Sequence, residues 1–168
     1  VSVDRTFNED GPAQTIDLTA IFTDANIPDV LGGANDFLTI TIEDNSAIVQ
    51  GSLSGSNSGL SATTLTLTPQ LNQNGNADPL TIRATDTQGA FVDLTVNVDV
   101  TAVNDEPSFV IGANQSVDED AGAQSVGSFA AGFVPGGGSD EDSQIIDSFI
   151  VSNDNADLFD TAPAIANN

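Results

Sequence analysis

Almost every side chain of this sequence that could take part in chemistry is a carboxylate. The 168 residues include 25 Asp and Glu against two basic residues, Arg5 and Arg83, which gives a formal net charge of −23. Cys, His, Trp, Tyr, Met and Lys are absent. Thiol and Ser–His nucleophiles, imidazole acid–base catalysis, Schiff bases and the usual zinc or haem ligands are therefore excluded. Only carboxylate catalysis remains, and nothing else in the sequence requires it, so we expect no enzyme.

The negative charge also restricts the partners of the chain. Proteins bind nucleic acids by neutralising phosphates with Lys and Arg, so we expect this chain to repel DNA, RNA and anionic membrane surfaces. Cations are its natural counter-charges, because many carboxylates raise the local cation concentration. No apolar run approaches the roughly 18 residues of a membrane span. Without Cys there are no disulfides, so stability is expected from sheet packing, with metal binding as a further source.

Apolar residues recur at every second position, which is typical of half-buried strands. The clearest run alternates five apolar residues with polar ones: Val92, Leu94, Val96, Val98 and Val100. Gly, Asn, Asp, Ser and Pro gather between such runs and indicate turns. The pattern predicts an all-β fold. Its first seven strands are expected at 1–7, 14–22, 37–43, 46–50, 62–68, 80–85 and 90–102, a number and spacing that fit a β-sandwich.

An internal repeat divides the chain. Residues 7–16 align with residues 117–126. After a slip of one residue, three further apolar positions of the first repeat align with three of the second: Leu18, Ala20 and Phe22 with Phe129, Ala131 and Phe133. We therefore predict one complete domain over residues 1–105 and a second domain over residues 106–168.

The second domain contains only the first half of the pattern. Its strands are expected near 109–117, 124–133 and 145–152, with a short one near 157–160. Half a sandwich cannot bury its inner face and leaves strand edges open to pairing. Three explanations remain: the protein continues beyond Asn168, a neighbouring chain supplies the missing strands and builds a head-to-tail fibre, or the second half is disordered.

Several motifs follow one another in the order found in one family. Residues 104–109 (Asn-Asp-Glu-Pro-Ser-Phe) resemble the linker that joins cadherin repeats, and residues 84–89 (Ala-Thr-Asp-Thr-Gln-Gly) resemble the loop before the last strand of such a repeat. Glu9 and Glu119 resemble the glutamate after the first strand. The acidic loop between the second and third strands has its counterpart in Asp24, Asn26 and Asp36, and again in Asp140 and Asp142. The chain is most similar to the cadherin-like repeats of large bacterial surface and biofilm proteins.

This resemblance implies tandem Ig-like, Greek-key β-sandwiches with Ca²⁺ at the junctions between them. Carboxylates and Asn carbonyls are the hard oxygen ligands that Ca²⁺ prefers. In the family's arrangement one cation would be held by a set of six residues: Glu9, Asp10, Asn104, Asp105, Asp140 and Asp142. A second half-site would comprise Asp24, Asp36 and Asp86, and Glu119 would serve the pole after the second domain.

Two departures from the family pattern predict fewer or weaker ions. Ala102 stands where the family has a first linker Asp, and the linker is one residue short before Pro107. The alternative, that these acids are only solvated loop residues, remains open at this point.

Two functions compatible with these observations belong to different classes. The first is a structural or adhesive repeat module of a secreted bacterial surface or filament protein, stiffened by Ca²⁺ and joined to neighbouring repeats or identical subunits. The second is a carbohydrate-binding module of a secreted polysaccharide-degrading protein that binds extracellular polysaccharide, although Trp and Tyr, which usually stack on sugars, are absent. A carboxylate glycosidase would need a cleft between two carboxyl groups. Because the chain opens on Val1 without a signal peptide, we expect a processed or excised piece of a longer extracellular protein.

Overall fold

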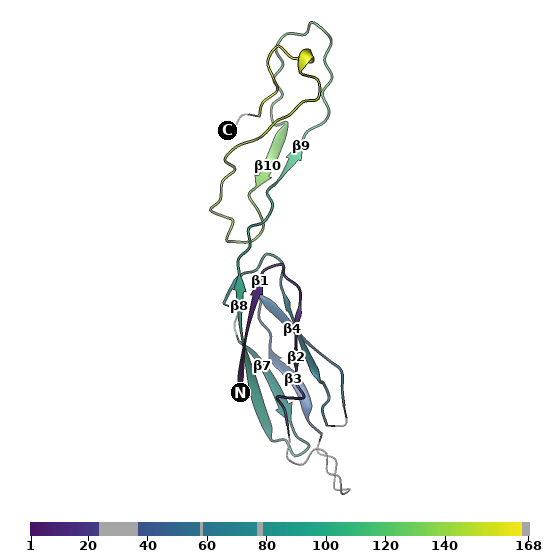
Figure 1. The fold of residues 1–168 in the computed structure, drawn as a ribbon, viewed down its shortest axis with the longest axis vertical. Helices are drawn as coiled ribbons and strands as arrows, with labels where there is room; N and C mark the ends of the chain where they lie inside the picture. Colours follow the sequence, from purple (N-terminus) through teal and green to yellow (C-terminus); the bar gives the residue numbers. More distant parts are fainter. Residues whose placement is uncertain (24–36, 58, 77–78, 166–168) are drawn as a thin grey trace. The chain divides into compact units, whose positions relative to one another are not determined.

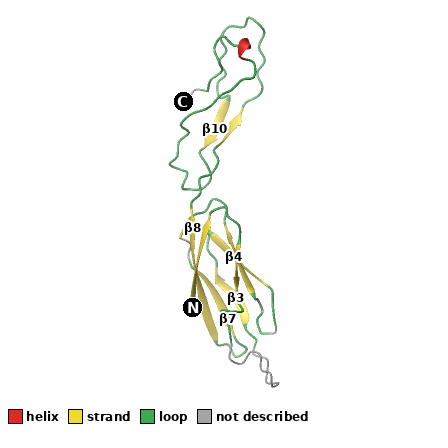
Figure 2. Cartoon of the chain, viewed as in Figure 1, coloured by secondary structure: helices red, strands yellow, loops and turns green. Residues whose placement is uncertain are grey.

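The computed structural model divides the chain into two compact units. Unit 1 comprises Val1–Val103 and unit 2 comprises Asn104–Asn168; the predicted boundary lay after residue 105. The structure describes residues 1–23, 37–57, 59–76 and 79–165. Apart from one turn of 3₁₀ helix, the regular structure of these residues is all β (Figures 1 and 2). None of their helices is long and apolar enough to cross a membrane.

The larger sheet of unit 1 has five strands. Its order is β1 (Ser2–Asn8), β8 (Phe91–Thr101), β7 (Leu80–Thr85) and β3 (Thr39–Asp44), and the short β6 (Gly75–Asn76) also pairs with β8. The β1–β8 pair is parallel, with Ser2 opposite Thr95, and the other pairs are antiparallel. The long strand β8 therefore organises the sheet, because three strands pair with it.

The smaller sheet of unit 1 is antiparallel and has the order β2 (Gln14–Asp17), β5 (Thr64–Pro69) and β4 (Val49–Ser54). The two sheets contribute to one hydrophobic core, an arrangement consistent with a β-sandwich. Strand β8 buries Leu94 and Val96 completely, while β5 does the same with Leu65 and Leu67. In these strands, the alternating apolar residues of the sequence face the core, and the polar residues between them face away from it.

Two strands of unit 1 differ from their predicted extent by three residues or more at one end or both. The strand predicted over 14–22 ends at Asp17, because the Asp17 carboxylate accepts hydrogen bonds from the backbone N–H and the hydroxyl of Thr19 and turns the chain. The N–H of Phe22 then bonds to the carbonyl of Leu18 at 2.9 Å. Both apolar side chains remain buried, although they lie in a turn rather than a strand.

The strand predicted over 46–50 instead spans Val49–Ser54. Residues 45–48 form a bent loop, in which the Ser46 hydroxyl accepts the N–H of Ile48 and the Asn45 side chain accepts the N–H of Gly51. Side chains of Asn and Ser compete with strand pairing for backbone donors in this way.

The described residues of unit 2 contain a single pair of strands, β9 (Ser108–Ile111) and β10 (Ala130–Val134), which is antiparallel. The strands predicted over 109–117 and 124–133 are therefore much shorter than expected. The strand predicted at 145–152 is wrong, and the one at 157–160 is replaced by the 3₁₀ turn η1 (Ala156–Leu158). Among the described residues of unit 2, these segments have no strand to pair with, and a strand needs a hydrogen-bonding neighbour.

None of the apolar residues that the structure describes in unit 2 is buried. The rings of Phe109 and Phe133 lie 5.6 Å apart, and those of Phe133 and Phe149 lie 4.7 Å apart. These rings also line a pocket of about 240 Å³. Among its described residues, the only side chain that is buried is an acid, Glu141.

Candidate cation-binding residues

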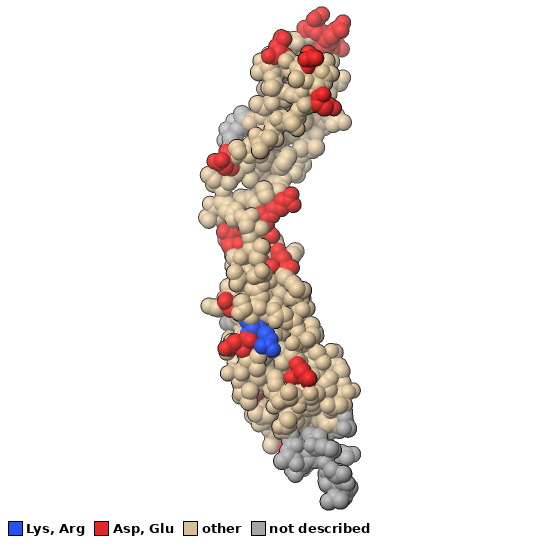
Figure 3. All heavy atoms as spheres, viewed as in Figure 1, with Lys and Arg blue, Asp and Glu red and all other residues tan. Residues whose placement is uncertain are grey.

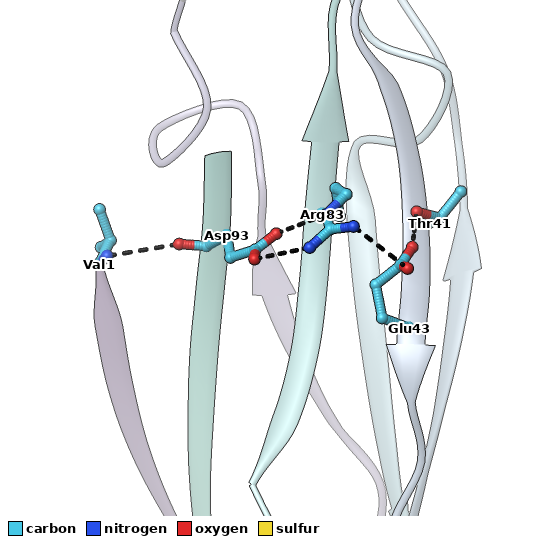
Figure 4. A network of polar contacts seen from close by, with 5 residues as sticks. All are labelled: Val1, Thr41, Glu43, Arg83 and Asp93. Carbon is cyan, nitrogen blue, oxygen red and sulfur yellow. Dashed lines mark hydrogen bonds and ion pairs between the residues drawn. The ribbon is translucent and has the colours of Figure 1, made fainter. Parts of the chain in front are cut away.

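Acidic side chains lie at many separate places on the surface shown in Figure 3, whereas basic atoms form one small patch. Arg83 is paired with acids of the larger sheet of unit 1, as Figure 4 shows. Its guanidinium donates to both carboxylate oxygens of Asp93, at 2.8 and 2.9 Å, and lies 3.6 Å from Glu43. It also stacks at 3.8 Å on the ring of Phe91. This hydrogen bonding lowers the pKa of Asp93. Asp93 and Glu43 already have Arg83 as a positively charged partner within the sheet, so they are not candidates for a cation site.

Glu9, the first predicted ligand, is held by protein donors. It follows β1, is only 2% exposed, and accepts a hydrogen bond at Oε1 from the N–H of Val103 at 2.6 Å. Its Oε2 accepts the side-chain amide of Asn74 at 3.0 Å. The backbone N–H of Glu9 donates to Thr101 at 2.9 Å. Glu9 therefore fastens the end of β1 to the end of β8 and to the loop before β6.

Asp10 stabilises the same end of unit 1. Its backbone has a φ of 58°, a left-handed conformation that Asp and Asn tolerate better than other residues with a side chain. Its Oδ1 accepts the N–H of Asn72 at 2.8 Å, and Asn72 has a φ of 55°. Two turns in left-handed conformation are thereby joined through one carboxylate.

In unit 2, the linker residues fold back onto the glycine-rich loop. The carboxylate of Asp105 accepts the N–H of Gly137 at 3.0 Å, and the N–H of Asp105 donates to Oε1 of Glu141 at 3.2 Å. Asn104 accepts the side-chain amide of Gln144 at 3.2 Å. A Cβ at Gly136 would lie 2.6 Å from Cγ of Glu141 and 3.0 Å from Cβ of Asp105. Glycine at position 136 is therefore what lets the two acids approach each other.

Glu141 is the most unusual group of this cluster. It is 2% exposed, and its Oε2 is buried without a hydrogen-bond partner among the described residues. Burial raises the pKa of Glu141, while the hydrogen bond from the N–H of Asp105 opposes this shift. The charges of Asp140 and Asp105 raise the pKa further, as does a hydrogen bond with the carboxyl of Asp140, which can form only when one of the two groups is protonated. A buried carboxylate oxygen without a donor costs free energy that a proton or a cation would recover.

Sequence reasoning missed Glu141. The resemblance points instead to the acids on either side of it, Asp140 and Asp142, because they stand where the family places an acidic loop between its second and third strands. In the structure Asp140 is half-buried and Asp142 is exposed. The available signal was the run of three acids that follows Gly136, Gly137 and Gly138 after a single serine, since closely packed glycines leave room for a buried neighbour.

The remaining predicted ligands are dispersed. Asp24 and Asp36 lie outside the described residues. Asp86 closes the turn between β7 and β8, because its Oδ1 accepts the N–H groups of Gln88 and Ala90, both at 2.8 Å. Glu119 is exposed in a turn of unit 2.

The structure brings Asn104, Asp105 and Glu141 together in unit 2. Glu9 and Asp10, which are consecutive in the chain, bond to different partners in unit 1. Within the described residues, no group of three or more His, Cys, Asp or Glu side chains is arranged to hold a metal ion by itself. Backbone carbonyls, Asn104 or water would have to complete the coordination of a cation at Glu141. The convergence of the six predicted ligands on one ion stays a prediction.

Comparisons with protein-family models, with curated protein sequences and with solved structures gave no match.

Proposed function

We propose that the chain is a structural or adhesive repeat module of a secreted bacterial surface or filament protein, with Ca²⁺ stiffening the segment around residues 104 and 105. The observation that carries this proposal is the buried, unpartnered Oε2 of Glu141, next to the charges of Asp105 and Asp140. The carboxylates of Glu141, Asp105 and Asp140 offer hard oxygen atoms, which are the donors that Ca²⁺ requires.

The side chains at this position are of the types that bind a calcium ion. Glu141 and Asp140 would supply carboxylate oxygens, and the side chains of Asn104 and Asp105 would complete the protein's share. The ion would supply positive charge where the protein has none, because unit 2 contains neither Arg nor Lys. Its effect on the chain would be to fix the linker residues to the loop of residues 136–144, and so to restrict the motion of the linker.

We further propose that unit 1 is an Ig-like β-sandwich, and the arrangement of its strands supports this fold. Two antiparallel-rich sheets share one core, and an N-terminal strand runs parallel to the last strand of the unit. Such sandwiches commonly serve as rigid spacers in cell-surface proteins. The lack of nucleophile and base pairs in the sequence is the reason that the proposal includes no catalysis.

The exposed apolar residues of unit 2 support association with neighbouring repeats or subunits. Strand addition would cover the apolar side chains and pair the open edges of β9 and β10. Identical chains joined in this way would form a head-to-tail fibre, because a heterologous contact of this kind does not close on itself.

The calcium proposal is tested by comparing the chain in EDTA with the chain in millimolar Ca²⁺. An ion that binds only the folded state adds RT ln(1 + [L]/Kd) to stability. We expect Ca²⁺ to raise the melting midpoint and to slow hydrogen exchange at the amides of Asp105 and Gly137.

Glu141→Gln sharpens the test, because it keeps the acceptor at Oε1 and removes the buried charge. In EDTA this variant should melt higher than the wild type, and it should lose the response to Ca²⁺. Asp147→Asn is the matched control, because Asp147 is an exposed acid of unit 2 outside the predicted set. Identical melting and exchange in EDTA and Ca²⁺ would contradict the proposal.

A further inference from the structure

The loop before β6 contains the only Asn-Gly pair of the sequence, Asn74-Gly75. Gly75 is exposed and has a φ of 106°, and a Cβ built on it would meet nothing within 4 Å. Asn74 is half-buried, and its amide nitrogen donates to Oε2 of Glu9 at 3.0 Å. From this geometry we propose that Asn74 is a site of spontaneous deamidation, and that the reaction disconnects Glu9 from the loop before β6.

The reaction needs only adjacent residues and water. The backbone nitrogen of Gly75 loses its proton and attacks Cγ of Asn74, so that a bond forms between these atoms and the bond from Cγ to Nδ2 breaks. Nδ2 leaves as ammonia and a five-membered succinimide remains. Water then opens this ring at either carbonyl carbon, which gives aspartate or isoaspartate. The absence of a side chain on Gly75 removes the steric obstacle to ring closure.

The product places two carboxylates where the structure has a hydrogen bond. The amide of Asn74 donates to Glu9, whereas an ionised carboxylate can only accept. Glu9 is almost fully buried, so the repulsion is screened little by solvent. Because Oε1 of Glu9 also accepts the N–H of Val103, the contact that fastens the end of β8 weakens as well. The isoaspartate product further lengthens the backbone beside β6, whose Gly75 lies opposite Val100.

The two asparagines followed by serine, Asn45 and Asn57, are less suited to the reaction. The side chain of Asn45 accepts the N–H of Gly51, and Ser46 after it is buried. Asn57 accepts the N–H groups of Gly59 and Leu60, each at 2.8 Å. The side chain of Asn74 is hydrogen-bonded as well, to Glu9, so side-chain hydrogen bonding does not distinguish the three asparagines. What distinguishes Asn74 is the following residue, because Gly75 has no side chain to obstruct the attack of its nitrogen. Asn74 is therefore expected to react first.

The first experiment incubates the full chain at mildly alkaline pH and body temperature for days. EDTA is present, so that the outcome does not depend on the proposed calcium site. Peptide mapping by mass spectrometry should show an NH group replaced by O at position 74, before any change at Asn45 or Asn57, and an enzymatic methylation assay should detect isoaspartate. An unchanged mass at Asn74, or earlier reaction of another asparagine, overturns the proposal.

The second experiment measures the consequence with variants that carry the product charge. Asn74→Asp should speed hydrogen exchange at the amide of Val103 by about tenfold or more and should lower the melting midpoint of unit 1. Gln73→Glu adds the same charge at the neighbouring exposed residue and should leave the exchange of Val103 unchanged. If both variants behave alike, the effect is one of net charge and the proposed disconnection of Glu9 is wrong.

Discussion

Units 1 and 2 contain similar sequence patterns and differ in how much of them is buried. In unit 1 four large apolar residues of the repeat are at most 5% exposed: Phe7, Ile16, Leu18 and Phe22. In unit 2 three of the aligned positions are 37–62% exposed: Val117, Val126 and Phe129. The fourth, Phe133, is half-buried. The pattern thus selects which side chains can face a core, but the core itself comes from other strands.

Unit 1 contains strands β5, β7 and β8. The described residues of unit 2 contain no counterpart of these three strands. In unit 1 the three strands contribute six completely buried side chains, which are Leu65, Leu67, Leu80, Ile82, Leu94 and Val96. Each large side chain that is removed from water contributes about 1.5–3 kcal/mol. An apolar stripe without such an opposing layer gains little from forming a strand, which explains why the predicted strands of unit 2 are short or missing.

The largest expected effect comes from opening the core of unit 1. Leu65→Ala should lower the free energy of unfolding by about 2–5 kcal/mol, because it leaves a cavity between the two sheets. Leu158→Ala in unit 2, where the side chain is 74% exposed, should change stability by less than about 0.5 kcal/mol. Denaturant unfolding at a concentration where the chain is monomeric measures both. An equally large loss in Leu158→Ala would mean that unit 2 has a covered core in solution.

A second test asks whether identical chains cover the apolar residues of unit 2. If they do, sedimentation should show mass rising with concentration. Ile150→Asp should weaken this association by about tenfold or more, because Ile150 is 98% exposed in the single chain and a side chain of its size contributes about 1.5–3 kcal/mol when buried.

Leu71→Asp is the control for that experiment, since Leu71 is an exposed apolar residue of unit 1 and should not take part. A wild-type chain that stays monomeric at every concentration would contradict assembly of identical subunits. A loss of association in Leu71→Asp would place the contact on the other unit.

The sequence predicts most of unit 1, because its strands follow strict alternation. Strand β7 has its predicted bounds, and β8 lies within one residue of its own. The misses in unit 1 arise where a side chain competes for backbone donors, as Asp17 and Asn45 do. Such competition depends on which donors are close in the folded chain, and alternation of apolar residues does not reveal it.

The candidate site is harder to predict than the strands. The sequence identifies the acidic loops but not which acid is buried, and Glu141 was missed for this reason. Nor does it reveal that Glu9 is satisfied by Val103 and Asn74, residues that are 94 and 65 positions away in the chain. Burial of a carboxylate is decided by tertiary packing, here by Gly136, whereas the residue type indicates only what the group could bind.

The smallest effect is expected for removing the charge of Asp93. Unlike Glu141, Asp93 is paired with a basic side chain, that of Arg83. The guanidinium of Arg83 lowers the pKa of Asp93, so the ionised form is favoured in the folded chain. The pair therefore adds to the free energy of unfolding at pH values above the pKa that Asp93 has in the unfolded chain. This stabilisation is lost as the pH falls through the lowered pKa of the folded chain. Burial shifts the pKa of Glu141 in the opposite direction.

In Asp93→Asn, the free energy of unfolding should fall slightly less than in the wild type as the pH is lowered from neutral to acidic. The difference is small because exposed ion pairs contribute little. Urea unfolding of the variant and the wild type between neutral and acidic pH measures this. Parallel profiles would show that the pair makes no pH-dependent contribution to unit 1.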